Sequence, residues 1–152
     1  STIAAIQRIA WELRPGVLDN LGLAAAIRQE IQRFQNRTGT HCQITTPPDD
    51  LPLPGETAIA LYRILQEALT NVTRHSRATQ LRVTLAADDA HLTLTVEDNG
   101  VGIASVQPSG RPSLGLLGMQ ERARLLGGSV EFSRVQPHGT RVTATVPLHP
   151  GP

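Results

Sequence analysis

The sequence predicts a two-layer α/β sandwich, in which helices cover one face of a mixed β-sheet. Two observations lead to this prediction: long segments with helical periodicity, and shorter segments in which apolar and polar residues alternate. The outward positions of the alternating segments are rich in threonine and arginine, so we expect the helices on the apolar face of the sheet only.

Two helices are expected before the sheet. The first covers residues 2–13, where isoleucines recur at every third position, and Pro15 ends it. The second runs from about Asn20 to Arg37, and Gly39 is its stop signal. Together they resemble part of a helical bundle joined to a globular domain.

The later elements alternate between strands and helices. In chain order we expect a strand at 41–46, a helix at 55–74, strands around 81–85 and 92–96, a helix at 116–126, and strands at 129–134 and 140–147. The strands around 81–85 and 92–96 form a hairpin, because only the turn at 87–90 separates them. Residues 99–114 contain glycine, serine and proline without periodicity and are expected to form a mobile loop.

Composition excludes several functional classes. Fourteen basic and 13 acidic residues leave a net charge of +1, so no nucleic-acid partner is expected. No apolar run reaches the roughly 20 residues that span a bilayer, and the single cysteine cannot form an internal disulfide. We therefore expect a cytoplasmic location, and because the chain starts at Ser1 within a helical pattern, we interpret it as a piece of a longer protein.

The end of the helix expected at 55–74 carries polar residues suited to a metal–phosphate group. Glu67 and Asn71 are four residues apart. Arg74 and His75 follow three and four residues after Asn71, so these side chains gather near one helix face. A carboxylate and an amide oxygen suit Mg²⁺, and a guanidinium suits phosphate oxygens. An exposed polar helix face is the alternative interpretation.

Two glycine-containing segments follow. The first comes directly after an apolar strand and contains Asp98, Gly100, Gly102 and Ile103. Its glycines let the backbone approach a ligand closely, and its aspartate is placed to accept a hydrogen bond from an exocyclic amine. The second leads into a helix, whose free N–H groups suit phosphates, and contains Gly115, Leu116, Leu117, Gly118 and Met119.

Taken alone, an Asp-Asn-Gly sequence is more often an ordinary turn, and the second segment is also compatible with a flexible loop that has a glycine-rich hinge. The spacing excludes a dinucleotide-binding G-x-G-x-x-G turn, and no Walker A motif is present.

The order of these features resembles the GHKL ATPases, the superfamily of DNA gyrase and the histidine kinases. Residues 67–75 match its N box, 98–102 its first glycine box and 115–119 its second, while Gly139 and Thr140 match a short element that opens a late strand. The resemblance covers residues from about 55 to 148. It implies the Bergerat form of the α/β sandwich and an ATP site.

Upstream motifs resemble the histidine kinases of the nitrate-sensor and DesK type. They are Leu13-Arg14-Pro15, Leu18-Asp19, Leu21-Gly22-Leu23 and Ala25-Ala26-Ile27, joined later by residues 73–78 and 118–122. The resemblance implies that residues 1–38 end a dimerisation and phosphoacceptor region with its linker helix, and that 39–152 form the ATP-binding catalytic domain. It also implies γ-phosphoryl transfer from ATP to a histidine absent from this chain, a response regulator as partner, and a homodimer in the full-length protein.

At the adenine end, the resemblance implies that Asp98 binds the exocyclic amine. Gly102 would shape the pocket floor, and Thr140 would lie near the adenine. Gly100 and Ile103 would complete this part of the ATP site.

At the phosphate end, Asn71 would hold Mg²⁺, with Glu67 as a second ligand directly or through water. Glu67 would also be the catalytic residue, orienting a metal-bound water or polarising the attacking imidazole. Arg74 and His75 would face the phosphates, and residues 115–119 would wrap the triphosphate.

The chain departs from the family pattern at two positions where glycine is common, Ser113 and His138. The remaining histidines have no partner motif and are interpreted as structural or surface residues: His41, His91, His138 and His149. Cys42 is interpreted as a small buried hydrophobe. Two alternative functions stay open, an anti-sigma-factor-type serine kinase and a nucleotide-binding module without transfer activity.

Overall fold

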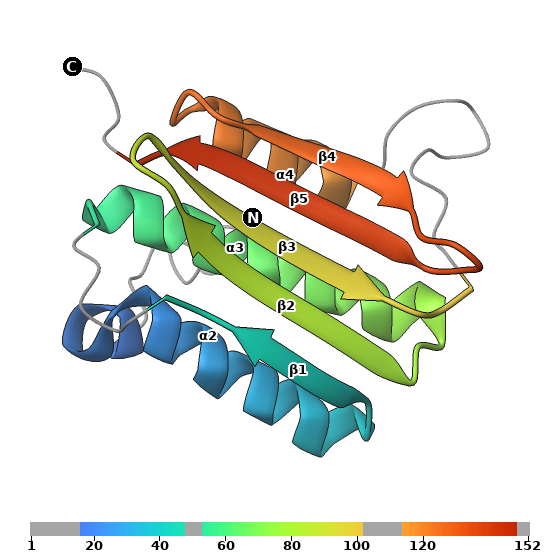
Figure 1. The fold of residues 1–152 in the computed structure, drawn as a ribbon. Helices are drawn as coiled ribbons and strands as arrows, with labels where there is room; N and C mark the ends of the chain where they lie inside the picture. The colour runs from blue at the N-terminus through green and yellow to red at the C-terminus, as the bar shows by residue number, and fades with distance from the viewer. Residues whose placement is uncertain (1–15, 48–52, 102–113, 149–152) are drawn as a thin grey trace, which may run out of the picture.

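The computed structural model describes residues 16–47, 53–101 and 114–148. The helix expected at 2–13 lies outside these ranges. The described elements are α2 (Gly16–Thr38), β1 (His41–Thr45), α3 (Gly55–Asn71), η1 (Val72–Ser76), β2 (Gln80–Ala87), β3 (His91–Asp98), α4 (Leu114–Arg124), β4 (Ser129–Arg134) and β5 (Thr140–Pro147). Figure 1 shows them as one sheet with helices behind it, which confirms the predicted fold class.

The five strands form one mixed sheet in the order β1-β2-β3-β5-β4. β1 pairs with β2 in parallel, and the other neighbours are antiparallel. The register aligns Leu81 of β2, Asp98 of β3 and Thr140 of β5 in one row. The end of β3 therefore lies beside the start of β5 at one end of the sheet.

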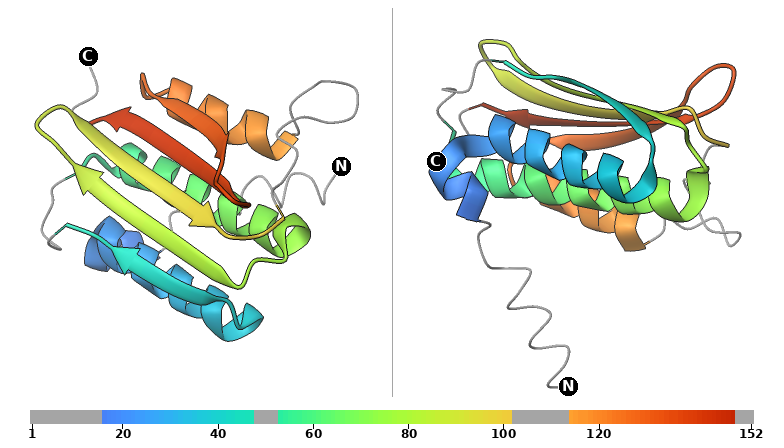
Figure 2. Two further views of the ribbon diagram at one scale, coloured as in Figure 1. Left: turned by 45° about the vertical axis from the view of Figure 1, so that its right-hand side comes forward. Right: turned by 90° about the horizontal axis from the view of Figure 1, so that it is seen from below.

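The helices form a second layer on one face of the sheet, as the view from below shows (Figure 2). α2 begins before the expected Asn20, and it contains a kink at Gly22, whose backbone has φ 85° and ψ 175°. α4 begins at Leu114, two residues earlier than predicted. The helix predicted to reach Arg74 is α-helical only to Asn71, and its last turn widens into the π-helix η1.

The core lies between the two layers and includes α2. Ile27 and Phe34 of α2 are almost fully buried and belong to the same apolar cluster as Leu65 of α3 and Val83 of β2. Burial of such side chains is the main stabilising term of a fold of this kind. The domain boundary expected after residue 38 stays a prediction.

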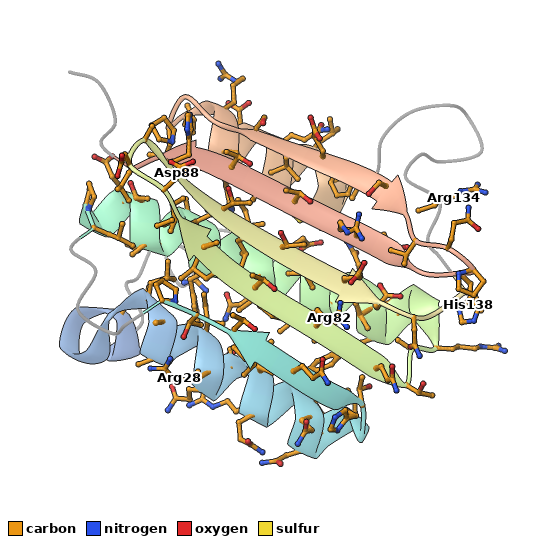
Figure 3. All side chains as sticks on the ribbon, viewed as in Figure 1. Arg28, Arg82, Asp88, Arg134 and His138 are labelled. Carbon is orange, nitrogen blue, oxygen red and sulfur yellow. The ribbon has the colours of Figure 1, made fainter. Side chains whose placement is uncertain are left out.

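The other face of the sheet carries the predicted threonines and arginines, with Arg82 turned to the viewer (Figure 3). Glu97 accepts a hydrogen bond from Arg141 at 2.6 Å and lies 3.6 Å from Arg82. Cys42 on β1 is half-buried rather than fully buried and packs against the core. Among the described helices, none is both long and apolar enough to cross a bilayer.

Candidate functional site

A cleft of about 410 Å³ lies between α3 with η1 on one side and α4 on the other. It is lined by Arg63, Glu67, Arg74, Leu114, Gly115, Gly118, Met119 and Arg122. The structure thus brings the predicted N-box residues Glu67 and Arg74 together with the second glycine box. The two segments are far apart in the chain, and the packing of α4 against α3 joins them.

Gly115 lies directly against Glu67. A β-carbon at position 115 would overlap with Oε1 of Glu67, so only glycine leaves this carboxylate its present place. Gly118, one turn later, has no neighbouring atom within 4 Å of the β-carbon position. The two predicted glycines of this box are therefore not equivalent: one makes room for a side chain of α3, and the other faces open space.

Asn71 is the last residue of α3, and Arg74 lies in the π-helix that follows. The wider turn of a π-helix changes the direction in which each following side chain points, and such turns are frequent at functional sites. Thr73 anchors this turn by donating its hydroxyl to the carbonyl of Leu69 at 3.0 Å. Arg74 is exposed, whereas the side chain of His75 lies outside the described part of the structure.

Asp98 ends β3 with a buried carboxylate that is 6% exposed. Its Oδ1 accepts a hydrogen bond from the backbone N–H of Gly100 at 2.8 Å, and the backbone N–H of Thr140 also donates to the carboxylate. Burial raises the pKa of Asp98, while these two hydrogen bonds act in the opposite direction. The result is a fixed acceptor at the end of the sheet.

Gly139 and Thr140 lie directly beside Asp98. Thr140 is the direct register partner of Asp98 and is itself buried. Gly139 has a φ of +131°, and a β-carbon there would overlap with the backbone carbonyl of Asp98. The Gly-Thr element and the first glycine box therefore form one structural unit, which only the sheet pairing assembles.

His138 completes this unit. Its Nδ1 lies 3.1 Å from the carbonyl oxygen of Gly100, and Figure 3 shows it at the turn between β4 and β5. A glycine at this position could not make that contact. This contact agrees with the interpretation of His138 as a structural residue, and its partner is the first glycine box.

Asn99 has a structural task as well. Its Oδ1 accepts hydrogen bonds from the backbone N–H groups of Thr79 and Gln80, both at 2.9 Å, at the start of β2. Its side chain therefore ties β3 to the chain that leaves η1. Gly102 and Ile103, the other predicted residues of this box, lie outside the described residues.

The predicted site residues of α4 lie on two faces of the helix, one buried and one exposed. Leu116 and Met119 are almost fully buried in the core, whereas Leu117 and Gly118 are exposed. This division follows helical periodicity, because residues three apart share a face. Any contact that Leu116 makes with a ligand would have to use its backbone.

Two arginines of the cleft, Arg63 and Arg122, were not among the site residues predicted from the sequence. Each lies four residues from a residue that was singled out: Arg63 precedes Glu67, and Arg122 follows Gly118. Residues four apart lie on the same face of a helix, so this spacing could have indicated that both arginines belong to the cleft. Among the described residues, no group of three or more His, Cys, Asp or Glu side chains is arranged to hold a metal.

Residues 56–150 match the family described as histidine kinase-, DNA gyrase B-, and HSP90-like ATPases. The chain belongs to this family. The match spans both glycine boxes, the N box and the Gly-Thr element, and it agrees with the mixed sheet and its single helical layer.

Curated relatives of this ATPase domain are sensor histidine kinases. It is 40% identical to the sensor histidine kinase MctS of Rhizobium johnstonii, over 95% of this chain and 32% of that protein. It is 34% identical to the oxygen sensor histidine kinase NreB of Staphylococcus carnosus, over 94% of this chain and 41% of that protein. The chain therefore spans well under half the length of these relatives.

The fold is also that of solved histidine kinase domains. The domain from the blue-light activated histidine kinase EL346 of Erythrobacter litoralis aligns with a TM-score of 0.70 and 23% identity, over 83% of this chain and 61% of that chain. At this level of identity the likeness supports the fold alone.

Proposed function

We propose that this chain is the ATP- and Mg²⁺-binding catalytic domain of a sensor histidine kinase, with residues 1–38 as the end of its dimerisation region. The observation that carries the proposal is the buried carboxylate of Asp98, held by the backbone N–H groups of Gly100 and Thr140. In a member of this ATPase family, such a fixed acceptor suits the exocyclic amine of adenine.

The chemistry of Asp98 supports this role. An ionised carboxylate has about four acceptor positions, and the two backbone donors leave some of them available to a ligand. A hydrogen bond to a charged acceptor in a partly buried place contributes about 1.5–3 kcal/mol. Because Gly139 and His138 hold the backbone around Asp98, the acceptor is in position before the ligand arrives. Gly102 and Ile103 would complete the adenine pocket.

The cleft between α3 and α4 would take the phosphates. The guanidinium of Arg74 and the N-terminal part of α4, at residues 115–119, would offer donors to phosphate oxygens. Asn71 and Glu67, one helical turn apart, would supply the amide and carboxylate oxygens that suit Mg²⁺ as ligands. Bound Mg²⁺ would neutralise phosphate charge, and His75 would add a further donor beside Arg74.

The transfer itself requires positioning more than covalent help from the protein. An imidazole nitrogen forms a bond with the γ-phosphorus as the bond between that phosphorus and the β–γ bridging oxygen breaks, and ADP leaves. Glu67 would polarise the attacking imidazole or orient a metal-bound water. The acceptor histidine would come from another segment of a homodimeric cytoplasmic protein, and a response regulator would then receive the phosphoryl group.

The first experiment is calorimetric titration of Asp98→Asn with Mg·ATP. We expect binding to be lost while the circular dichroism spectrum stays that of the wild type. Asp89→Asn, in the exposed turn between β2 and β3, is the matched control and should bind as the wild type does. Unchanged ATP affinity in Asp98→Asn would overturn the nucleotide assignment.

A second experiment tests transfer. The chain is incubated with radiolabelled ATP and a separate acceptor-helix protein that contains a histidine followed by an acidic residue. Acid-labile label on that histidine is the expected result. Nucleotide binding without any labelled histidine would instead indicate a binding module without transfer activity.

A further inference from the structure

Two arginines from different helices flank Glu67 in the cleft. Arg63 lies one turn before Glu67 on α3, and Arg122 lies in the last turn of α4. Both are half-buried, and neither belongs to the residues that the family resemblance places in the ATP site. Arg63 is held in place by Gln66, whose Oε1 accepts a hydrogen bond from its Nη1 at 2.7 Å.

Basic side chains outnumber acidic ones in the described lining of the cleft. Its described lining contains three guanidinium groups, from Arg63, Arg74 and Arg122, but only one carboxylate, from Glu67. Burial lowers the pKa of Arg122, the positive charge of Arg63 lowers it further, and the carboxylate of Glu67 raises it. Like charges brought together in a half-buried cleft cost free energy, which a bound anion would recover. The cleft is thus electrostatically suited to a group with more than one negative charge.

The directions of α3 and α4 indicate which part of a bound nucleotide would reach Arg63 and Arg122. α3 leads through η1 to the start of β2, so its C-terminus lies at the Asp98 end of the sheet. Arg63 is eight residues before Asn71, about 12 Å farther from that end along the helix axis.

α4 runs in the opposite direction to α3, away from the Asp98 end of the sheet. It leads to the start of β4, where Ser129 pairs with Thr145, at the opposite end of the sheet from Asp98. Arg122, in its last turn, is therefore also on the side of Glu67 remote from Asp98. A nucleotide whose adenine lies at Asp98 would bring its last phosphate, and not its first, to these two arginines.

We propose that Arg63 and Arg122 bind the γ-phosphoryl group and make this site discriminate ATP from ADP. The inference rests on the proposed function, because it takes the adenine position from Asp98. The two guanidiniums hold the phosphoryl group beside Glu67, which is where an attacking imidazole would need it.

The experiment compares Mg·ATP with Mg·ADP affinity by calorimetry on this chain. For Arg122→Gln and Arg63→Gln we expect ATP affinity to fall by roughly 10-fold to 100-fold, and ADP affinity by less than about twofold. Arg122→Lys keeps the charge and should retain part of the preference for ATP. Arg124→Gln is the matched control, since this arginine of the same helix is exposed and paired with Glu121.

The outcomes separate cleanly. If Arg63→Gln and Arg122→Gln lose equal affinity for ATP and ADP, or lose none, the γ-phosphoryl assignment is overturned. The proposed function then still stands, because the wild-type chain binds ATP. A wild-type chain that bound neither nucleotide would overturn the proposed function and this inference with it. If Arg122→Gln unfolds, as shown by circular dichroism, Arg63→Gln and Arg122→Lys decide the question alone.

Discussion

The backbone of Gly139 packs against the carbonyl group of Asp98 so closely that no β-carbon fits between them. The next residue, Thr140, then donates its backbone N–H to the Asp98 carboxylate. The glycine directly before β5 thus sets the position of the acceptor at the end of β3. This contact explains physically why the two motifs belong together.

We predict that Gly139→Ala is strongly destabilising. The new methyl group would meet backbone atoms that cannot rotate away, and the φ of +131° is itself costly for alanine. We expect a loss of roughly 3 kcal/mol or more in the free energy of unfolding. Gly39→Ala is the control, because its φ is +77° but its β-carbon would meet nothing, and it should cost only about 1 kcal/mol. If urea denaturation gave similar losses in the free energy of unfolding for Gly139→Ala and Gly39→Ala, the close contact with Asp98 would not be the cause.

Gly115 and Gly118 make a second matched pair. Gly118→Ala should stabilise α4 by about 0.5–1 kcal/mol, since its β-carbon enters open space. Gly115→Ala displaces the carboxylate of Glu67, a flexible group, so the fold should survive with little change in melting temperature. Phosphoryl transfer by Gly115→Ala should nevertheless drop by roughly 10-fold or more, because Glu67 is misplaced. A Gly115→Ala variant that transfers the phosphoryl group as fast as the wild type would argue against a role for the Glu67 position.

The raised pKa of Asp98 predicts how the stability of the fold depends on pH. Burial raises this pKa in the folded protein above its value in the unfolded chain, so the folded state binds the proton more readily. The contribution of Asp98 to the free energy of unfolding is therefore most favourable at acid pH. It declines as pH rises from the unfolded-state pKa through the raised pKa of the folded state. The stability of Asp98→Asn relative to the wild type should improve from pH 3.5 to pH 7, measured by urea denaturation without nucleotide. A trend in the opposite direction would show that the two backbone hydrogen bonds outweigh burial.

The place of α2 in the core can be tested with the two phenylalanines of the chain. Phe34 on α2 is 1% exposed, and Phe132 on β4 is only half-buried. Phe34→Ala should cost about 3–5 kcal/mol and Phe132→Ala clearly less. A chain that begins at residue 39 should accordingly fail to give a cooperative thermal transition. If it unfolds cooperatively at the wild-type temperature, the boundary at residue 38 separates two independent units.

Much of the fold was predictable because its periodicities are local. The alternation of Leu92, Leu94 and Val96 with threonines predicts one buried strand face, and β3 has that pattern. The errors fall at helix ends. Nothing in the local pattern distinguishes an α-helical from a π-helical turn at 72–76, and the start of α4 depends on its packing against α3.

By itself, the sequence determined the class of the fold, the order of its elements and the polar and glycine residues from which a site could be built. These follow from side-chain chemistry and from spacings of two, three and four residues along the chain. Tertiary structure alone decided how those residues combine. It placed Gly115 against Glu67, joined Gly139 to Asp98 and brought Arg63 and Arg122 into one cleft. The physical reason is that helix packing and strand register, which no local pattern encodes, set the distances between residues far apart in the chain.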